Sequence, residues 1–282
     1  MYDNYIFDLY GTLADIRTNE EKPYLWRKMS ELYTSLGAAY TASGLRTGFR
    51  RLEREYAGRM ESEAGRTEQE DLLAEPDLTE VFRGLFLEKA VACNRETARM
   101  TAIFFRALSR QMLRVYDGVK ETLGELRRRG GRLYLLSNAQ SDFTRPELEL
   151  LGLADCFDGI LISSEEGCKK PCAAFFTRLL ERYGLDPARS IMVGNDEFSD
   201  IAGAVGMGMD SLYLHTATSP QPQGKYRPTY CVMDGDWGKV ADILLSEKRT
   251  AACADAKRPN RQHRKVVLVG DMRNFNKKGT GI

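Results

Sequence analysis

Short apolar runs alternate with helical segments through the second half of this 282-residue chain, and this alternation limits the folds open to it. The runs expected to form strands share aliphatic or aromatic residues and flanking turn residues: 132–137, 159–163, 190–194, 210–215 and, as an edge strand, 230–233. The segments between them have the composition of helices: 119–126, 173–183, 199–205 and 237–245. Strands that alternate with helices form βαβ units with parallel strands. The chain is therefore predicted to have an α/β fold with a Rossmann-like parallel sheet.

One further strand is expected near residue 5, far from the others along the chain. The residues from 16 to about 112 follow helical spacing instead, most clearly over 95–115. Between this first strand and residue 132, no convincing strand is predicted. The expected organisation is an α/β core made of residues 1–14 and 115–246, with an all-helical insertion at 15–114.

Asp8 stands at the carboxyl end of the expected first strand. The apolar residues 5–7 precede it, and Gly11 supplies a turn shortly after it. Ligands of open α/β sheets bind at the carboxyl ends of the strands. Asp8 is therefore a candidate nucleophile, because its carboxylate would meet a substrate there. Taken alone, such an aspartate could equally cap a turn or a helix.

Two other polar segments follow expected strands in the same way. Ser137 and Asn138 end the strand at 132–137, where a hydroxyl and an amide could bind a phosphoryl oxygen, although such residues are also common in turns. Lys170 comes after the next strand, where its ammonium could balance both Asp8 and an anionic substrate. A lysine in a loop is otherwise a solvated charge.

Asp196 and Asp200 follow the strand at 190–194, four residues apart. If a helix begins at Asp196, this spacing places both carboxylates on one face. Carboxylates beside Asp8 would suit Mg²⁺, which prefers oxygen ligands and usually keeps several waters. The alternative is that Asp196 caps a helix and Asp200 lies at the surface.

The order of these segments, from Asp8 through Ser137 and Lys170 to the two aspartates, resembles the four motifs of the haloacid dehalogenase-like hydrolase superfamily. The resemblance covers residues 2 to 215 and includes a helical cap inserted after the first strand. It implies a Mg²⁺-dependent phosphatase that acts on small phosphorylated metabolites through an aspartyl-phosphate intermediate.

The resemblance also implies roles for individual residues. The implied catalytic residues are Asp8, Lys170 and Tyr10. Those implied to bind substrate are Leu9, Thr12, Ser137 and Asn138. The implied ligands of Mg²⁺ are Asp8, the backbone carbonyl of Tyr10, Asp196 and Asp200.

Tyr10 departs from the pattern of the superfamily's phosphatases, which usually carry an aspartate two residues after the nucleophile. That aspartate protonates the leaving alcohol and then activates water, whereas tyrosine, with an ordinary pKa near 10, is a weak base at neutral pH. Tyrosine occupies this position in the 2-haloacid dehalogenases, but those enzymes have small polar residues in place of Asp196. A phosphatase is the preferred interpretation. A metal-independent dehalogenase and a catalytically weak phosphometabolite-binding protein are the alternatives.

Charge is balanced over the whole chain but not along it. The 41 basic and 40 acidic residues indicate no polyanionic partner, and no specific nucleic acid is expected. Residues 247–282 hold ten basic and three acidic residues, and this basic tail is predicted to be mostly disordered. Residues 265–270 within it have the composition of a strand without an assigned partner.

Nothing in the sequence predicts a membrane protein. Apolar runs fall short of the roughly 18 residues that a spanning helix needs. The six cysteines show no CxxC spacing and are expected to be reduced. The expectation is a cytoplasmic protein with a small-molecule partner and no membrane partner, and the oligomeric state stays open.

Overall fold

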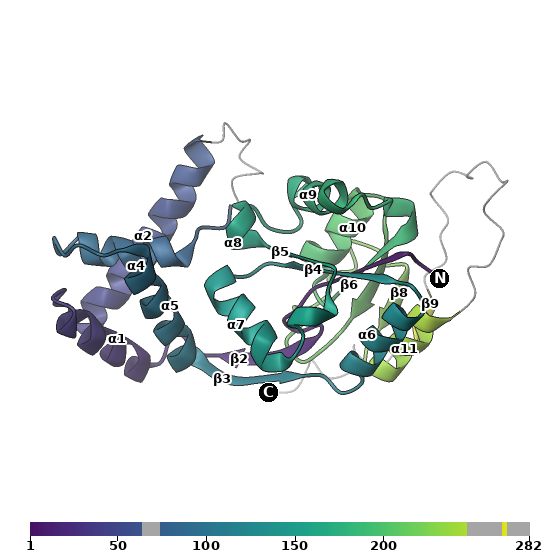
Figure 1. Cartoon of the computed structure of the whole chain (residues 1–282), viewed down its shortest axis with the longest axis horizontal. Helices are drawn as coiled ribbons and strands as arrows, with labels where there is room; N and C mark the ends of the chain where they lie inside the picture. Colours follow the sequence, from purple (N-terminus) through teal and green to yellow (C-terminus); the bar gives the residue numbers. More distant parts are fainter. Residues whose placement is uncertain (64–73, 247–266, 270–282) are drawn as a thin grey trace, which may run out of the picture.

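A seven-stranded sheet forms the centre of the computed structural model, which describes residues 1–63, 74–246 and 267–269 (Figure 1). Its strands lie in the order β5–β4–β1–β6–β7–β8–β9, and all neighbouring strands are parallel. Their bounds are β1 Asn4–Phe7, β4 Arg132–Ser137, β5 Gly159–Ile162, β6 Ser190–Gly194, β7 Asp210–Leu214, β8 Tyr230–Val232 and β9 Val267–Val269. The predicted α/β fold is confirmed.

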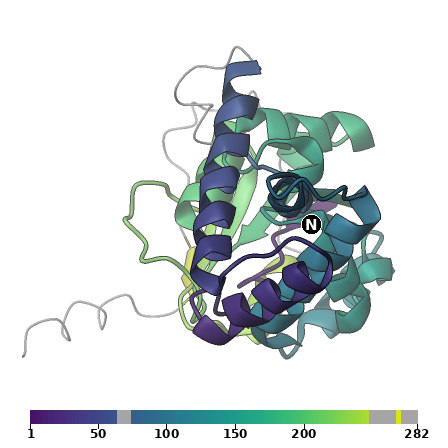
Figure 2. The ribbon, with the colours of Figure 1, turned by 90° about the vertical axis from the view of Figure 1, so that its left-hand side faces the viewer.

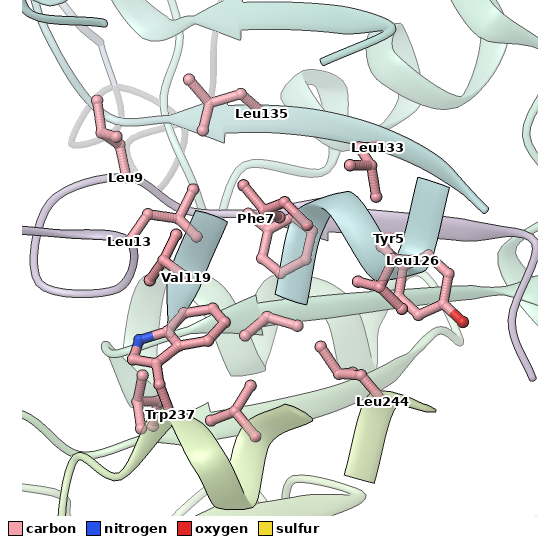
Figure 3. Close-up of a cluster of buried hydrophobic side chains, with 14 of the residues drawn as sticks. Tyr5, Phe7, Leu9, Leu13, Val119, Leu126, Leu133, Leu135, Trp237 and Leu244 are labelled. Carbon is pink, nitrogen blue, oxygen red and sulfur yellow. The ribbon is translucent and has the colours of Figure 1, made fainter. Parts of the chain in front are cut away.

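Helices cover both faces of the sheet because alternate strand residues point to opposite faces. Phe7 of β1 packs on the side of Trp237, with ring centroids 6.5 Å apart (Figure 3). Ile6 belongs to the cluster on the other side, which includes Phe175. The first side is covered by α6 Val119–Arg128, α7 Ser141–Leu151 and α11 Trp237–Leu245, and the second by α9 Ala173–Tyr183 and α10 Ala202–Gly206.

A helical insertion follows the first strand, as predicted. It contains α1 Pro23–Ser35, α2 Ala42–Glu63, α4 Leu78–Leu87 and α5 Arg95–Ser109, which share a hydrophobic cluster of their own. Asp77 and Asn94 cap α4 and α5 through their side-chain oxygens. Figure 2, in which the insertion faces the viewer, shows α1 and α2 in front of the sheet.

The insertion is joined to the sheet domain by two antiparallel strands, β2 Ala14–Thr18 and β3 Arg110–Val115. The prediction of an uninterrupted helix over 95–115 is therefore wrong beyond Ser109, as is the expectation of no strand before residue 132. Met112 and Val115 fit the helical spacing of α5, so the apolar pattern alone continues the helix. This segment forms a strand because it pairs with β2, which is far away in the sequence.

The sequence did not predict α7, which contains a proline in its interior, Pro146. This helix belongs to the sheet domain, yet its Phe143 side chain is part of the hydrophobic cluster of the insertion. The insertion and α7 thus share one core.

Val267–Val269 of the predicted basic tail form β9, which pairs with β8. The strand-like composition at 265–270 therefore has a partner at the sheet edge. The rest of the predicted tail, 247–266 and 270–282, lies outside the described residues. The disorder predicted for it therefore stays a prediction. In the described part of the chain, no helix combines the length and apolarity needed to cross a membrane.

Candidate active site

Lys170 joins two carboxylates at the carboxyl ends of the central strands. Its Nζ lies 2.8 Å from Asp8 Oδ1 and 2.7 Å from Asp200 Oδ1, and it also donates to the carbonyl oxygen of Leu136 at 2.7 Å. All three charged side chains are buried. Burial disfavours the charge on Lys170, but the Asp200 and Asp8 carboxylates outweigh it and raise the pKa of this lysine. The ammonium of Lys170 thus lies between the two carboxylates.

Asp200 reaches Lys170 because Gly194, the last residue of β6, has no side chain. A Cβ atom added at Gly194 would lie 2.2 Å from Asp200 Oδ2, far inside van der Waals contact. The same Oδ2 accepts the backbone N–H of Asp196 at 3.0 Å. Burial raises the pKa of Asp200, and the charge of Lys170 only partly offsets this. The carboxylate is held between Lys170 and the start of the π-helical turn Glu197–Ile201.

The loop after Asp8 is fixed by a turn and by Asn195. Gly11 has φ +84°, a conformation that favours glycine, and a Cβ atom there would lie 2.3 Å from Asn195 Nδ2. The Thr12 hydroxyl lies 3.1 Å from Asp8 Oδ2 and 3.3 Å from Asn195 Oδ1. The Leu9 side chain is fully buried in the hydrophobic cluster of the sheet, so only its backbone could meet a ligand.

Ser137 and Asn138, at the end of β4, differ in their environments. Asn138 exchanges two hydrogen bonds with the backbone of Lys170, at 3.0 Å and 2.8 Å, and so orients the lysine. The Ser137 hydroxyl is buried and has no hydrogen-bond partner among the described residues. Because buried hydroxyls are normally satisfied, an unpaired one at a strand end suits an absent ligand oxygen.

The structure does not bring the three carboxylates together in the way that their spacing suggests. Asp196 Oδ1 accepts the backbone N–H groups of Phe198 and Ser199, at 2.8 Å and 3.2 Å, and so caps the turn that follows. Asp8 and Asp200 instead meet at Lys170. Over the described ranges, no group of three or more His, Cys, Asp or Glu residues is arranged to hold a metal ion.

Tyr10 directs its hydroxyl to α7. The oxygen lies 2.5 Å from Glu147 Oε2 and 3.2 Å from Thr144 Oγ1. Glu147 is buried and also accepts hydrogen bonds from Arg106 of α5 and Arg110 of β3. Burial and the Glu147 carboxylate raise the pKa of Tyr10 well above that of a free tyrosine. Tyr10 is therefore a neutral phenol with its proton bound to Glu147.

Sequence reasoning missed Glu147, Arg106 and Asn195. The first two act through contacts between segments far apart in the chain, and α7 itself was not predicted. Asn195 stands inside the recognised segment 190–200, and its position directly after Gly194 was the available signal.

Comparisons with known proteins identify the family to which this chain is similar. A family model described as haloacid dehalogenase-like hydrolase matches residues 2–208. The chain is 34% identical over 148 residues to a phosphoserine phosphatase of Thermus thermophilus, a match that covers 52% of this chain and 58% of that protein. It is 28% identical over 210 residues to a phosphoglycolate phosphatase of Vibrio vulnificus, covering 74% of this chain and 81% of that protein.

A solved structure of a 2-haloacid dehalogenase from Pseudomonas syringae has the same fold. The TM-score is 0.60 at 21% identity, and the match covers 87% of this chain and 99% of that one. The chain spans less than two thirds of the length of several curated relatives. One example is a glyceraldehyde 3-phosphate phosphatase of Methanothermobacter thermautotrophicus, to which the chain is 35% identical over 105 residues. That match covers 37% of this chain and 46% of the relative.

Proposed function

The chain belongs to the haloacid dehalogenase-like hydrolase family, and we propose that it is a Mg²⁺-dependent phosphatase of small phosphorylated metabolites, acting through an aspartyl-phosphate intermediate. The observation that carries this proposal is the 2.8 Å contact between Lys170 Nζ and Asp8 Oδ1, buried at the carboxyl ends of the central strands. The ammonium stabilises a negatively charged nucleophile and offsets the charge of a phosphate. Several relatives are phosphatases by name, which supports phosphorus over carbon as the point of attack.

The described residues can each be assigned a role in this reaction. Asp8 attacks phosphorus, and Thr12 orients its carboxylate through Oδ2. The unpaired Ser137 hydroxyl is placed to bind a phosphoryl oxygen. Asn138 holds the backbone at Lys170, and Asp200 holds its ammonium. Water then attacks the phosphorus of the aspartyl-phosphate, the bond between phosphorus and the Asp8 oxygen breaks, and inorganic phosphate leaves.

The donor set fits Mg²⁺, although it does not contain three converging carboxylates. Mg²⁺ is commonly held by one or two carboxylates together with waters and substrate phosphates. Asp8 and Asp196 would be the protein carboxylates, together with the backbone carbonyl of Tyr10. Asp200 is engaged by Lys170 and by the Asp196 N–H, so its contribution is to hold these groups. When bound, the cation supplies further charge compensation for the phosphoryl group.

The decisive experiment measures phosphate release and halide release by the same preparation. Wild type should release phosphate from a panel of phosphorylated metabolites with Mg²⁺. Asp8→Asn should lose this activity completely while keeping its fold, because the substitution is nearly isosteric. Asp155→Asn, at an exposed aspartate in the short turn that follows α7, is the matched control and should keep full activity. Turnover by Asp8→Asn within a few-fold of wild type would overturn the nucleophile assignment.

Tyr10 supports a second candidate function, that of a 2-haloacid dehalogenase. Such an enzyme needs neither a metal nor a proton for its leaving group. The same preparation distinguishes the two. Release of halide from 2-haloacids that continues in EDTA, without release of phosphate from any ester, would favour the dehalogenase. Binding of phosphorylated metabolites without either reaction would favour a binding protein.

A further inference from the structure

The proton donors in contact with Asp8 already take part in hydrogen bonds within the protein. An ammonium has three N–H groups, and Lys170 donates to Asp8, Asp200 and the Leu136 carbonyl oxygen. The Thr12 hydroxyl is engaged with Asp8 itself. The hydroxyl of Ser137 is unpaired, but an alcohol is no stronger an acid than the alcohol that it would protonate.

Tyr10 does not supply the missing proton either. Its proton is bound to Glu147 at 2.5 Å, and Glu147 is further fixed by Arg106 at 2.8 Å and 3.0 Å and by Arg110 at 2.9 Å. The hydroxyl hydrogen is therefore engaged with α7, and it would have to leave this hydrogen bond before it could reach a substrate oxygen.

From this arrangement we propose a substrate class that rests on the proposed phosphatase function. The enzyme acts on phosphoanhydrides and acyl phosphates, whose leaving groups depart as stable anions, in preference to alkyl phosphate esters. The Asp8 oxygen forms a bond to phosphorus while the bond from phosphorus to the leaving oxygen breaks, and that oxygen keeps the electron pair. No proton transfer to the leaving group is needed in this step.

The size of the preference follows from the value of general acid catalysis, which is typically about 10² to 10⁴-fold. An alkyl ester loses this factor in full, because its alkoxide is a very poor leaving group without a proton. An acyl phosphate or a pyrophosphate loses little. The expected kcat/KM for acetyl phosphate therefore exceeds that for glycerol phosphate by about 10²-fold or more.

A series of aryl phosphates tests the inference on one scaffold. Wild-type kcat/KM is measured with Mg²⁺ for phosphates of dinitrophenol, nitrophenol and unsubstituted phenol, and then for acetyl phosphate, pyrophosphate and glycerol phosphate. This ratio reports the steps up to departure of the leaving group, so slow hydrolysis of the aspartyl-phosphate does not obscure it. The expected result is a steep fall in kcat/KM as the leaving group becomes more basic.

Two substitutions at Tyr10 identify the cause of the slope. Tyr10→Asp places a carboxyl group that no longer reaches Glu147, and it should flatten the series by accelerating the poorest leaving groups most. Tyr10→Phe keeps the ring and removes the hydroxyl, and its slope should equal that of wild type. A steeper slope in Tyr10→Phe would show that the hydroxyl does protonate the leaving group, and would overturn the inference.

A flat wild-type series with turnover that depends on Asp8 would also reject the inference while sparing the proposed function. Failure of every phosphate in the series, the acyl phosphate included, would instead reject the proposed function.

Discussion

Glu147 of α7 binds Arg106 of the helical insertion through two hydrogen bonds, from Nε at 2.8 Å and from Nη2 at 3.0 Å. The Glu147 side chain is 2% exposed and that of Arg106 is 14% exposed, so water screens the pair poorly. The same carboxylate accepts the Tyr10 hydroxyl. The insertion, α7 and the loop that follows Asp8 therefore meet at one buried charge.

Removal of this charge should destabilise the whole protein. Breaking one partner of a buried ion pair typically costs about 3–5 kcal/mol, because the other charge stays buried and unpaired. Glu147→Gln is expected to lower the free energy of unfolding by about this amount in a denaturant titration. Glu149→Gln, at an exposed position two residues away on the same helix, should change it by less than about 0.5 kcal/mol. Equal effects of the two substitutions would contradict the proposed importance of the pair.

The contribution of Glu147 should disappear in acid. Burial favours its neutral form, but the hydrogen bonds and charge of Arg106 outweigh burial and lower the pKa of Glu147 in the folded protein. The unfolded chain then binds a proton more readily than the folded one. The stabilisation is complete above the unfolded pKa, near 4.3, and is lost as the pH falls through the lower folded value. The stability difference between wild type and Glu147→Gln should therefore begin to shrink as the pH falls below about 4.3, and a difference that is constant with pH would refute this account.

Gly194 should tolerate no side chain. A methyl group there would lie 2.2 Å from Asp200 Oδ2 and displace the carboxylate from Lys170. Gly194→Ala is expected to lower stability by about 1–3 kcal/mol, as overpacking does, and to lower kcat strongly. Gly124→Ala, inside α6 with nothing within 4 Å of the added methyl group, should be up to about 1 kcal/mol more stable than wild type. Full activity of Gly194→Ala would show that the position of Asp200 is unimportant.

Mg²⁺ should stabilise the folded protein through Asp196. A ligand that binds only the folded state raises the melting temperature as its concentration rises above Kd. Thermal unfolding of wild type is expected to shift upward with Mg²⁺, and EDTA should reverse the shift and stop phosphate release. Asp196→Asn should weaken both effects. Asp186→Asn, at an aspartate that caps a different turn, should behave like wild type. Equal stabilisation of both variants by Mg²⁺ would place the cation elsewhere.

Local patterns in the sequence determined the parallel sheet, the helical insertion, the position of Asp8 at a strand end and that of Lys170 in the connection after β5. These features depend on residues close together in the chain, where the spacing of apolar side chains reflects which face is buried. The structure then separates Lys170 from its neighbour Lys169, which ion-pairs with Glu75 of the insertion at 3.4 Å.

Only the tertiary structure decided what these residues contact. The β2–β3 pair, the place of α7 and the contact between Tyr10 and Glu147 join segments roughly a hundred or more residues apart. The spacing of Asp196 and Asp200 indicated a shared face, but it could not show that one carboxylate caps a turn while the other meets Lys170. Such pairings depend on how distant elements pack, and no local pattern of apolar and polar residues encodes them.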